Sequence, residues 1–438
     1  MSAPLPAAST PGWRWAPAWV IAFVALWPAP GYAEGVLVLG ALAGLSKLVA
    51  SRFRGGAALL SGPAWALTSV LFFAYWLPQL LSAPDALDRG RAFREAVIDL
   101  RYLPFLWVVA SAVANEAGRR RTFGGLALIV VAWTADALVE AVAGTSPLFW
   151  MLDQAKLAIS GHGMCTAAQT AAADRLAGVL GPCNLKLGIV LASLSPFALD
   201  MAQRRGGRLG WLLMAVALGV VVMLAGSRAS WLTYALVLAW TGWRLLGWKR
   251  MLGILLAGAL TLGAAALLSP SLGERVQRSA EVFAGDARGV DHALSGRTRI
   301  WSAALCMVRE HPVNGVGARG FREAFPACDP AQGVIAAWGT GVALHAHQIV
   351  LEVLSETGIL GLLLWLAGAA LAWRAWRYAL PQARERARPA MLALAVTVFP
   401  LNTHLAAYAT FWGSVLLLLA ALYAGSLWGS GTQASGQQ

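Results

Sequence analysis

The stretch Leu209–Gly226, LGWLLMAVALGVVVMLAG, decides the class of this chain. It contains only apolar residues and glycine, and it is long enough for one helix to cross the hydrocarbon core of a bilayer. Arg204, Arg205 and Arg208 precede it, and Arg228 follows it after one residue, Ser227. The same alternation of apolar runs with short basic clusters recurs along the chain and predicts an integral membrane protein.

The composition supports lipid as the main solvent. The chain has 438 residues, of which 58% are hydrophobic and 13% charged, and its mean hydropathy is +0.62. Soluble domains carry roughly 25% charged residues. The net charge of +13 could suggest a nucleic-acid partner, but the basic residues sit between apolar runs, and many of the 21 tryptophans lie near the ends of these runs. We therefore expect membrane lipids, and no nucleic acid, around the chain.

The apolar runs predict an all-α polytopic protein with about twelve transmembrane helices. Pro28, Pro30 and Gly31 interrupt the first two runs, which leaves a re-entrant pair as an alternative there. No signal peptide is expected. The predicted spans are 16–33, 34–50, 57–80, 103–116, 123–143, 185–202, 209–226, 230–246, 251–269, 348–373, 390–408 and 411–428.

Every second connection between spans is basic and almost free of acids, which assigns these connections and both termini to the cytoplasm of a bacterial inner membrane. The opposite, periplasmic side then holds segments 83–102, 144–184 and 270–346, with all six histidines and all four cysteines. The local cysteine pairings there are Cys165–Cys183 and Cys306–Cys328, with free thiols as the alternative. The chain divides into a bundle of about nine spans (1–269), a periplasmic helical cap (270–346), three further spans (347–428) and a flexible cytoplasmic tail (429–438).

His347 is the first candidate for chemistry. It is expected just before the N-terminus of the tenth span, where backbone N–H groups attract anions and disfavour a protonated imidazole. A neutral histidine beside a bound phosphate suits a general base. Helix capping is the structural alternative, and His345 is the rival base.

Gln348, Glu352 and Glu356 follow at four-residue spacing and share one face of that helix. Carboxylates at this depth face a bundle interior or a water-filled cavity. They are supporting candidates, with a structural pairing of Glu356 with an arginine as the alternative.

Two arginines are candidates for binding an anion. Arg228 follows Gly226-Ser227 between two spans with almost no loop, so it either reaches lipid phosphates or binds an anionic ligand. Arg297 belongs to the run Ser295–Trp301, which begins an amphipathic helix predicted to continue to about Glu310, and Arg299 is a supporting candidate on the same helix. Guanidinium groups match phosphate oxygens in bidentate fashion.

The segments assigned to the periplasm contain no paired acidic motif for a divalent cation, no Walker-type loop and no serine-hydrolase elbow. No metal and no cofactor are expected.

His347-Gln348, followed after nine residues by Gly358-Ile359-Leu360-Gly361, resembles the H-[N/S/Q]-x9-G-x2-[G/T/Y] motif of bacterial O-antigen ligases. Gly-Ser-Arg228 and Ser-Gly-Arg297 with Trp301 are similar to motifs of the wider O-antigen ligase/polymerase superfamily. So is Arg175-Leu-Ala-Gly178 with Pro182 and Asn184, between which Cys183 stands here.

This resemblance implies a GT-C-like, inverting, metal-independent glycosyltransferase. The donor would be a glycan on undecaprenyl diphosphate and the acceptor a hydroxyl of lipid A–core. His347 would deprotonate that hydroxyl, and Arg228 and Arg297 would bind the diphosphate, with Arg175 as a supporting residue.

Three alternatives remain. An O-antigen polymerase would use the same donor. A protein O-oligosaccharyltransferase usually carries a larger extracytoplasmic portion near its C-terminus. A transporter or flippase would call for internal repeats, and the sequence contains none that we detect.

Overall fold

The computed structural model describes residues 13–54, 58–173, 175–226, 228–268, 273–274, 277, 294, 296–335, 338, 341–402 and 406–429. Within these ranges every regular element is a helix, which confirms the all-α class. His292, Ser295, Ser227, His404 and the tail from 430 onward lie outside the described residues. The helices are α1 (Ala16–Ala25), α2 (Pro30–Arg54), α3 (Gly62–Ser82), η1 (Ala83–Asp85), α4 (Arg89–Asp99), α5 (Tyr102–Ala112), α6 (Glu116–Ala143), α7 (Pro147–Ser160), α8 (Ala167–Ala171), η2 (Gly178–Leu180), α9 (Leu187–Leu224), α10 (Arg228–Leu246), α11 (Trp248–Leu268), α14 (Arg297–Glu310), α15 (Phe321–Cys328), α16 (Ile349–Tyr378), α17 (Pro381–Thr397) and α18 (Thr410–Leu427).

Each predicted span overlaps a helix or half of one, although several boundaries differ. The backbone of α9 breaks at Gly207, where φ is 59°, so its two halves correspond to the sixth and seventh spans on either side of the arginine cluster 204–208. Among the described helices, seven are long and apolar enough to cross a membrane. One of them is α2, whereas α1 has only 10 residues.

The eleventh span was predicted at 390–408, and this boundary is wrong. The helix there, α17, covers Pro381–Thr397. Proline favours the first turn of a helix, which explains the start at Pro381, and Pro400 cannot continue a helix, which explains the early end.

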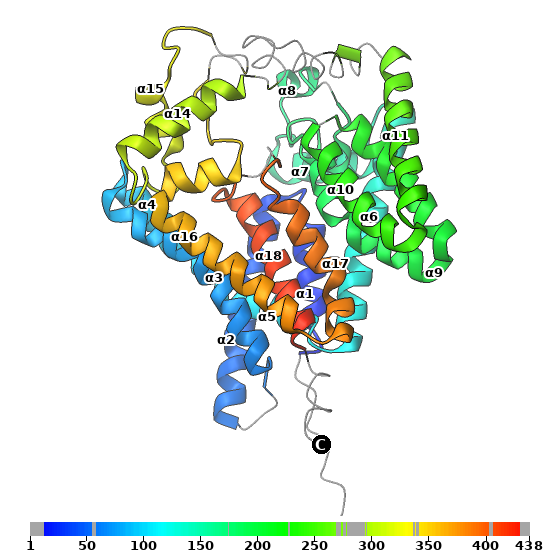
Figure 1. Ribbon diagram of the computed structural model, residues 1–438, viewed down its shortest axis with the longest axis horizontal. Helices are drawn as coiled ribbons and strands as arrows, with labels where there is room; N and C mark the ends of the chain where they lie inside the picture. The colour runs from blue at the N-terminus through cyan, green and yellow to red at the C-terminus, as the bar shows by residue number, and fades with distance from the viewer. Residues whose placement is uncertain are drawn as a thin grey trace, which may run out of the picture.

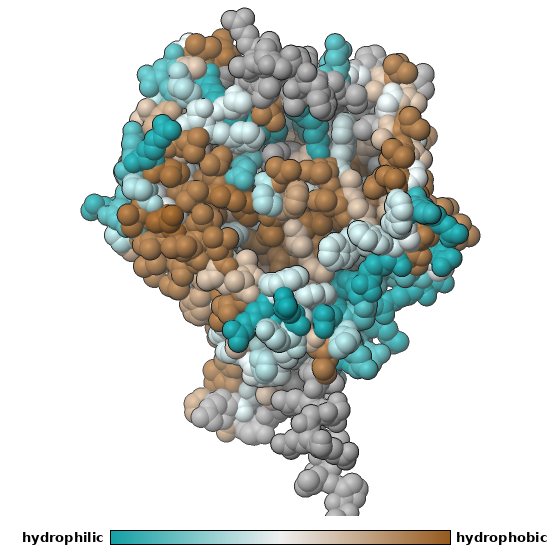
Figure 2. Space-filling view, viewed as in Figure 1, coloured by the Kyte–Doolittle hydropathy of each residue, from teal (hydrophilic) through white to brown (hydrophobic). Residues whose placement is uncertain are grey.

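The bundle is organised around α18. Of this helix, 89% is buried inside the protein, so it forms the centre of the bundle. It packs against α17, α5 and α3, while α16 packs along α3 and α9 packs between α6 and α10. Figure 1 shows α14 and α15 together at one end of the bundle, which we call the cap end. An apolar band covers the middle in Figure 2, and hydrophilic residues gather at the opposite end, which we call the basic end.

The cap has a small core of its own. Ile300 and Met307 of α14 pack with Phe321 and Phe325 of α15. A disulfide between Cys306 and Cys328 joins the two helices, and a second disulfide joins Cys165 to Cys183. These are the two local pairings that the sequence offered.

The cap joins the bundle where α16 breaks. Gly358 has a φ of +64°, and a Cβ atom there would lie 2.0 Å from the carbonyl oxygen of Val313. The break lets the chain before α15 pair with α16: Ile359 N–H donates to Pro312 O at 2.9 Å, and Val316 N–H donates to Ser355 O at 2.9 Å. Only glycine fits this conformation and this approach.

Candidate functional site

Two helices begin with arginines that lie close together. Arg228 opens α10, and Arg297 opens α14 after Gly296, which is in the left-handed conformation with φ 74°. Burial, together with the nearby charge of Arg228, lowers the pKa of Arg297 to about 10. Among the described residues, the Arg297 side chain forms no hydrogen bond or ion pair. The two guanidinium groups therefore create a positively charged, partly desolvated place that suits an anion.

His347 lies in the segment that connects the cap to α16. Its φ is +54°, an uncommon conformation for a residue other than glycine. Its ring centroid lies 3.9 Å from that of His345, and both side chains are half-buried. Strained backbone of this kind persists only when the surrounding structure holds it, and it is frequent at functional sites.

The histidine segment is tied to the helix that carries Arg297. The indole N–H of Trp301 donates to the carbonyl oxygen of Ala346 at 3.1 Å, and Ala346 is buried in the cap core. Trp301 stands four residues after Arg297, which is about one helical turn. The structure thus connects the first turns of α14 with the segment before α16.

Gln348 caps α16. Its Oε1 accepts from the backbone N–H of Leu351 at 2.6 Å. The side chain therefore satisfies one of the open donors of the first turn, and its contribution to the site is to fix the helix start beside His347.

Glu352 and Glu356 are both buried, and both bind backbone groups. Glu356 Oε2 accepts from the backbone N–H of Arg319 at 2.8 Å. Glu352 Oε1 accepts from Tyr408 N–H at 3.4 Å, and its Oε2 has no partner among the described residues. These contacts give both carboxylates a structural function at the junction of α16 with the cap and with the turn before α18.

Sequence reasoning missed Arg319, the residue that anchors the cap. Its side chain bonds to Glu95 of α4 at 2.6 Å, to Tyr408 O at 2.6 Å and to Thr410 of α18 at 2.8 Å. Its φ of +62° and the glycines that flank it, Gly317 and Gly320, mark a tight turn. The glycine-rich run was a signal of that turn, but the partners are far away in the sequence.

Arg299 is fully engaged inside the cap. It binds Asp329 through two hydrogen bonds of 2.5 and 2.6 Å and donates to Val334 O and Ala331 O. The hydrogen bonds from Arg299 hold the pKa of Asp329 below the usual range, although desolvation acts in the opposite direction. The backbone N–H of Ala331 and the positive charge of Arg299 add to this lowering. The arrangement indicates that Arg299 stabilises the loop after α15.

Arg175 lies beside the start of α10. The next residue, Leu176, donates its N–H to Leu224 O at 3.4 Å near the end of α9. Glu140 of α6 accepts from the N–H groups of Ala177 and Gly178. The Arg175–Gly178 segment is therefore held next to the turn that precedes Arg228.

Among the described residues, the group with metal-ligand spacing is Cys306, Glu310 and Cys328. The two sulfur atoms are bonded to each other, so they offer no thiolate to a metal. Neither this group nor the arginines form a site that suits a divalent cation.

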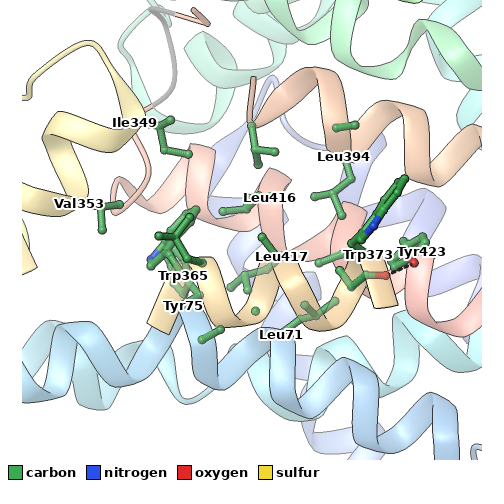
Figure 3. A pocket seen from close by; sticks show the side chains of 18 of the residues that line it. Leu71, Tyr75, Ile349, Val353, Trp365, Trp373, Leu394, Leu416, Leu417 and Tyr423 are labelled. Carbon is green, nitrogen blue, oxygen red and sulfur yellow. Dashed lines mark hydrogen bonds between the residues drawn. The ribbon is translucent and has the colours of Figure 1, made fainter. Parts of the chain in front are cut away.

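An apolar groove reaches Ile349, the first residue of α16. Its volume is about 450 Å³, and it lies between α3, α16, α17 and α18. In Figure 3, Ile349 and Val353 lie at one end of the groove, and Trp373 and Tyr423 at the other. Ile349 is two residues after His347 in the chain, and the groove runs from Ile349 along the bundle towards the basic end.

Comparison with known families gives one match. Residues 212–366 match the family described as O-antigen ligase. This segment extends from the second half of α9 into α16, so it includes Arg228, Arg297 and His347. No curated protein matches the chain.

Proposed function

We infer that this multi-pass membrane protein, assigned by residues 212–366 to the O-antigen ligase/polymerase superfamily, is an O-antigen ligase. It transfers a finished glycan from undecaprenyl diphosphate to a hydroxyl of lipid A–core at the periplasmic face of the bacterial inner membrane. The reaction inverts the anomeric carbon and needs neither metal nor cofactor. Two observations carry this proposal: the charge of Arg228 acts on the half-buried Arg297, and the helix that Arg297 opens is hydrogen-bonded through Trp301 to Ala346, the residue before His347.

The diphosphate of the donor binds between Arg228 and Arg297. Burial and the charge of Arg228 disfavour the charged form of Arg297, and an anion with two phosphates bound beside Arg297 would offset this cost. As the bond from the anomeric carbon to the diphosphate breaks, negative charge grows on the leaving oxygen. Fixed guanidinium groups stabilise that charge most in the transition state. This arrangement supplies by arginine what other phosphate enzymes obtain from a divalent cation.

His347 acts as the general base. It accepts the proton of the acceptor hydroxyl while that oxygen attacks the anomeric carbon from the face opposite the diphosphate. The anchored segment supports this role, because Gln348 fixes the helix start after it and Trp301 fixes Ala346 before it. His345, with its ring 3.9 Å away, orients the His347 ring.

The groove beside Ile349 takes the first part of the isoprenoid chain. In the donor, the diphosphate joins the sugar directly to the lipid, so the chain must enter the membrane close to the reacting carbon. In lipid A–core, by contrast, several sugars separate the reacting hydroxyl from the acyl chains. A groove that begins at Ile349, two residues after the proposed base, therefore fits the donor's lipid better than the acceptor's.

A deletion strain distinguishes the ligase from an O-antigen polymerase, the alternative within the same superfamily. We expect the deletion to leave bare lipid A–core while long glycan accumulates on undecaprenyl diphosphate. Core that bears single repeat units would instead identify a polymerase. Normal lipopolysaccharide in the deletion strain would contradict both the ligase and the polymerase function and would favour a transporter.

A further inference from the structure

The second cavity of interest lies at the basic end, on the opposite side of the bundle from His347. Its volume is about 540 Å³, and it lies between the start of α6, the break in α9, the end of α10 and the start of α17. Figure 2 shows hydrophilic residues gathered at this end. The distribution of basic residues assigns this end to the cytoplasm.

The charge of the cavity is unbalanced. Its lining contains two carboxylates, Asp200 and Glu385, against five arginines. Arg204 pairs with Asp200 at 2.8 Å, and Glu385 binds two more arginines. The five arginines are Arg119, Arg204, Arg244, Arg386 and Arg388.

Arg119 and Arg386 carry the excess charge. Both are half-buried, and neither forms an ion pair or a side-chain hydrogen bond with any residue that the structure describes. A general surplus of cytoplasmic arginines would place such groups on the exposed surface. Here two of them line one cavity, so their charge favours an anionic occupant.

One wall residue of the cavity also carries a buried polar group. Trp211 lines the cavity and is fully buried, and its indole N–H has no acceptor among the described residues. A buried donor without a partner costs free energy unless a water or a ligand accepts its proton.

The remaining walls are apolar. Leu199, Leu245 and Leu392 line the cavity, and Trp240 of α10, which also lines it, is 53% exposed at the surface of the bundle. Tryptophan in such a position is typical of the membrane interface. These walls match an anionic headgroup that is joined to a hydrocarbon chain.

We propose that this cavity is a binding site for the phosphodiester headgroup of an anionic phospholipid. Arg119 and Arg386 contact the phosphate oxygens, the indole N–H of Trp211 donates to an oxygen of the headgroup, and the acyl chains leave along Trp240 into the bilayer. Basic pockets between membrane helices on the cytoplasmic side bind lipids of this kind. The site is independent of the glycan-transfer reaction.

The test measures binding of phosphatidylglycerol to the purified full chain in detergent by native mass spectrometry. The double variant Arg119→Gln/Arg386→Gln removes the two unpaired cations. Its matched control, Arg121→Gln/Arg205→Gln, removes two cations of the same end that do not line the cavity. We expect an affinity loss of about 30-fold for the first variant and little change for the control.

Equal losses of lipid affinity in the two double variants would overturn the proposal. Such a result would mean that the lipid responds to the general positive potential of this end and not to the cavity. Equal binding of phosphatidylcholine, or competition by inorganic phosphate at millimolar concentration, would also overturn it. Melting temperatures in lipid-free detergent check the folding of each variant. If the double variant does not fold, Gln203→Trp adds bulk at an exposed lining residue without removing a charge, and unchanged lipid binding would then refute the site.

Discussion

Two arginines on one helix, Arg297 and Arg299, should respond to the same substitution in opposite ways. The change is Arg→Gln at each position, which removes the charge and keeps much of the side-chain volume. Arg297 is partly buried near Arg228, and both effects lower its pKa to about 10. A cation whose pKa is lowered in the folded protein opposes folding at neutral pH, so Arg297→Gln should leave the melting temperature unchanged or raise it.

The cost of Arg297→Gln should appear in the reaction. Loss of one fixed group that stabilises developing charge reduces turnover on the order of 100- to 1000-fold. The assay is transfer of glycan from a lipid-linked donor to lipid A–core by purified protein in detergent, with initial rates measured at several donor concentrations. Arg297→Lys retains the charge without the bidentate geometry and should recover part of the rate.

Arg299→Gln should instead destabilise the cap. Its side chain is 15% exposed and that of Asp329 is 10% exposed. Removing one partner of a buried ion pair lowers the free energy of unfolding. We expect a loss of ~3 kcal/mol here, the low end of the range for buried pairs, because both side chains keep some exposure to solvent. The melting temperature should fall, while the folded fraction keeps its turnover. A fall in stability with Arg297→Gln, or unchanged turnover, would refute the assignment of Arg297 to the diphosphate.

Three further substitutions test the groove, the break in α16 and the choice of base. Gly358→Ala should cost about 3 kcal/mol or more, because its Cβ would lie 2.0 Å from Val313 O at a positive φ. Gly124→Ala, where a Cβ meets nothing within 4 Å, should be nearly neutral in the same thermal unfolding measurement. Ala369→Trp fills the apolar groove and should raise the KM for the lipid-linked donor about tenfold. The control variant, Ala370→Trp at the exposed neighbouring position, should leave this KM unchanged. Equal KM values for the two variants would refute the proposal that the donor lipid binds in the groove. His345→Ala should reduce the rate about tenfold without abolishing it, since His345 orients the base, and complete loss of activity would make it the base instead.

The helices were predictable from the sequence because apolar length and basic clusters act locally. The arginine cluster at 204–208 predicted a boundary between two spans, and α9 breaks within this cluster, at Gly207. The amphipathic spacing likewise predicted α14 and its end at about Glu310. The start of α16 at Ile349 followed from the polar His-Gln pair before an apolar run.

The tertiary partners were not predictable in the same way. Arg299 was a candidate for the site because it lies two residues from Arg297, yet its partner Asp329 comes 30 residues later. Arg319 was missed because its partners, Glu95 and Tyr408, lie far away on both sides in the sequence. A single sequence gives the residue types and their local spacing, whereas such pairs depend on how the helices pack.

The glycines of the His-Gln motif illustrate the difference. Their spacing suggested a family resemblance but gave no physical reason for glycine. In the structure, Gly358 admits the backbone of Val313, and Gly361 lies against Pro78 of α3 and Thr357. The motif therefore combines a candidate base with the backbone geometry that joins the cap to the bundle.

The most direct test of the central claim is the transfer reaction of purified wild-type protein and His347→Ala, with a lipid-linked glycan donor, lipid A–core and a chelator of divalent cations. We predict that the wild type forms glycan-bearing lipid A–core in the presence of the chelator. His347→Ala should retain donor binding and the wild-type melting temperature but lose product by several orders of magnitude. Product formed by His347→Ala at the wild-type rate, or a wild-type protein that stops when the chelator is added, would contradict the account.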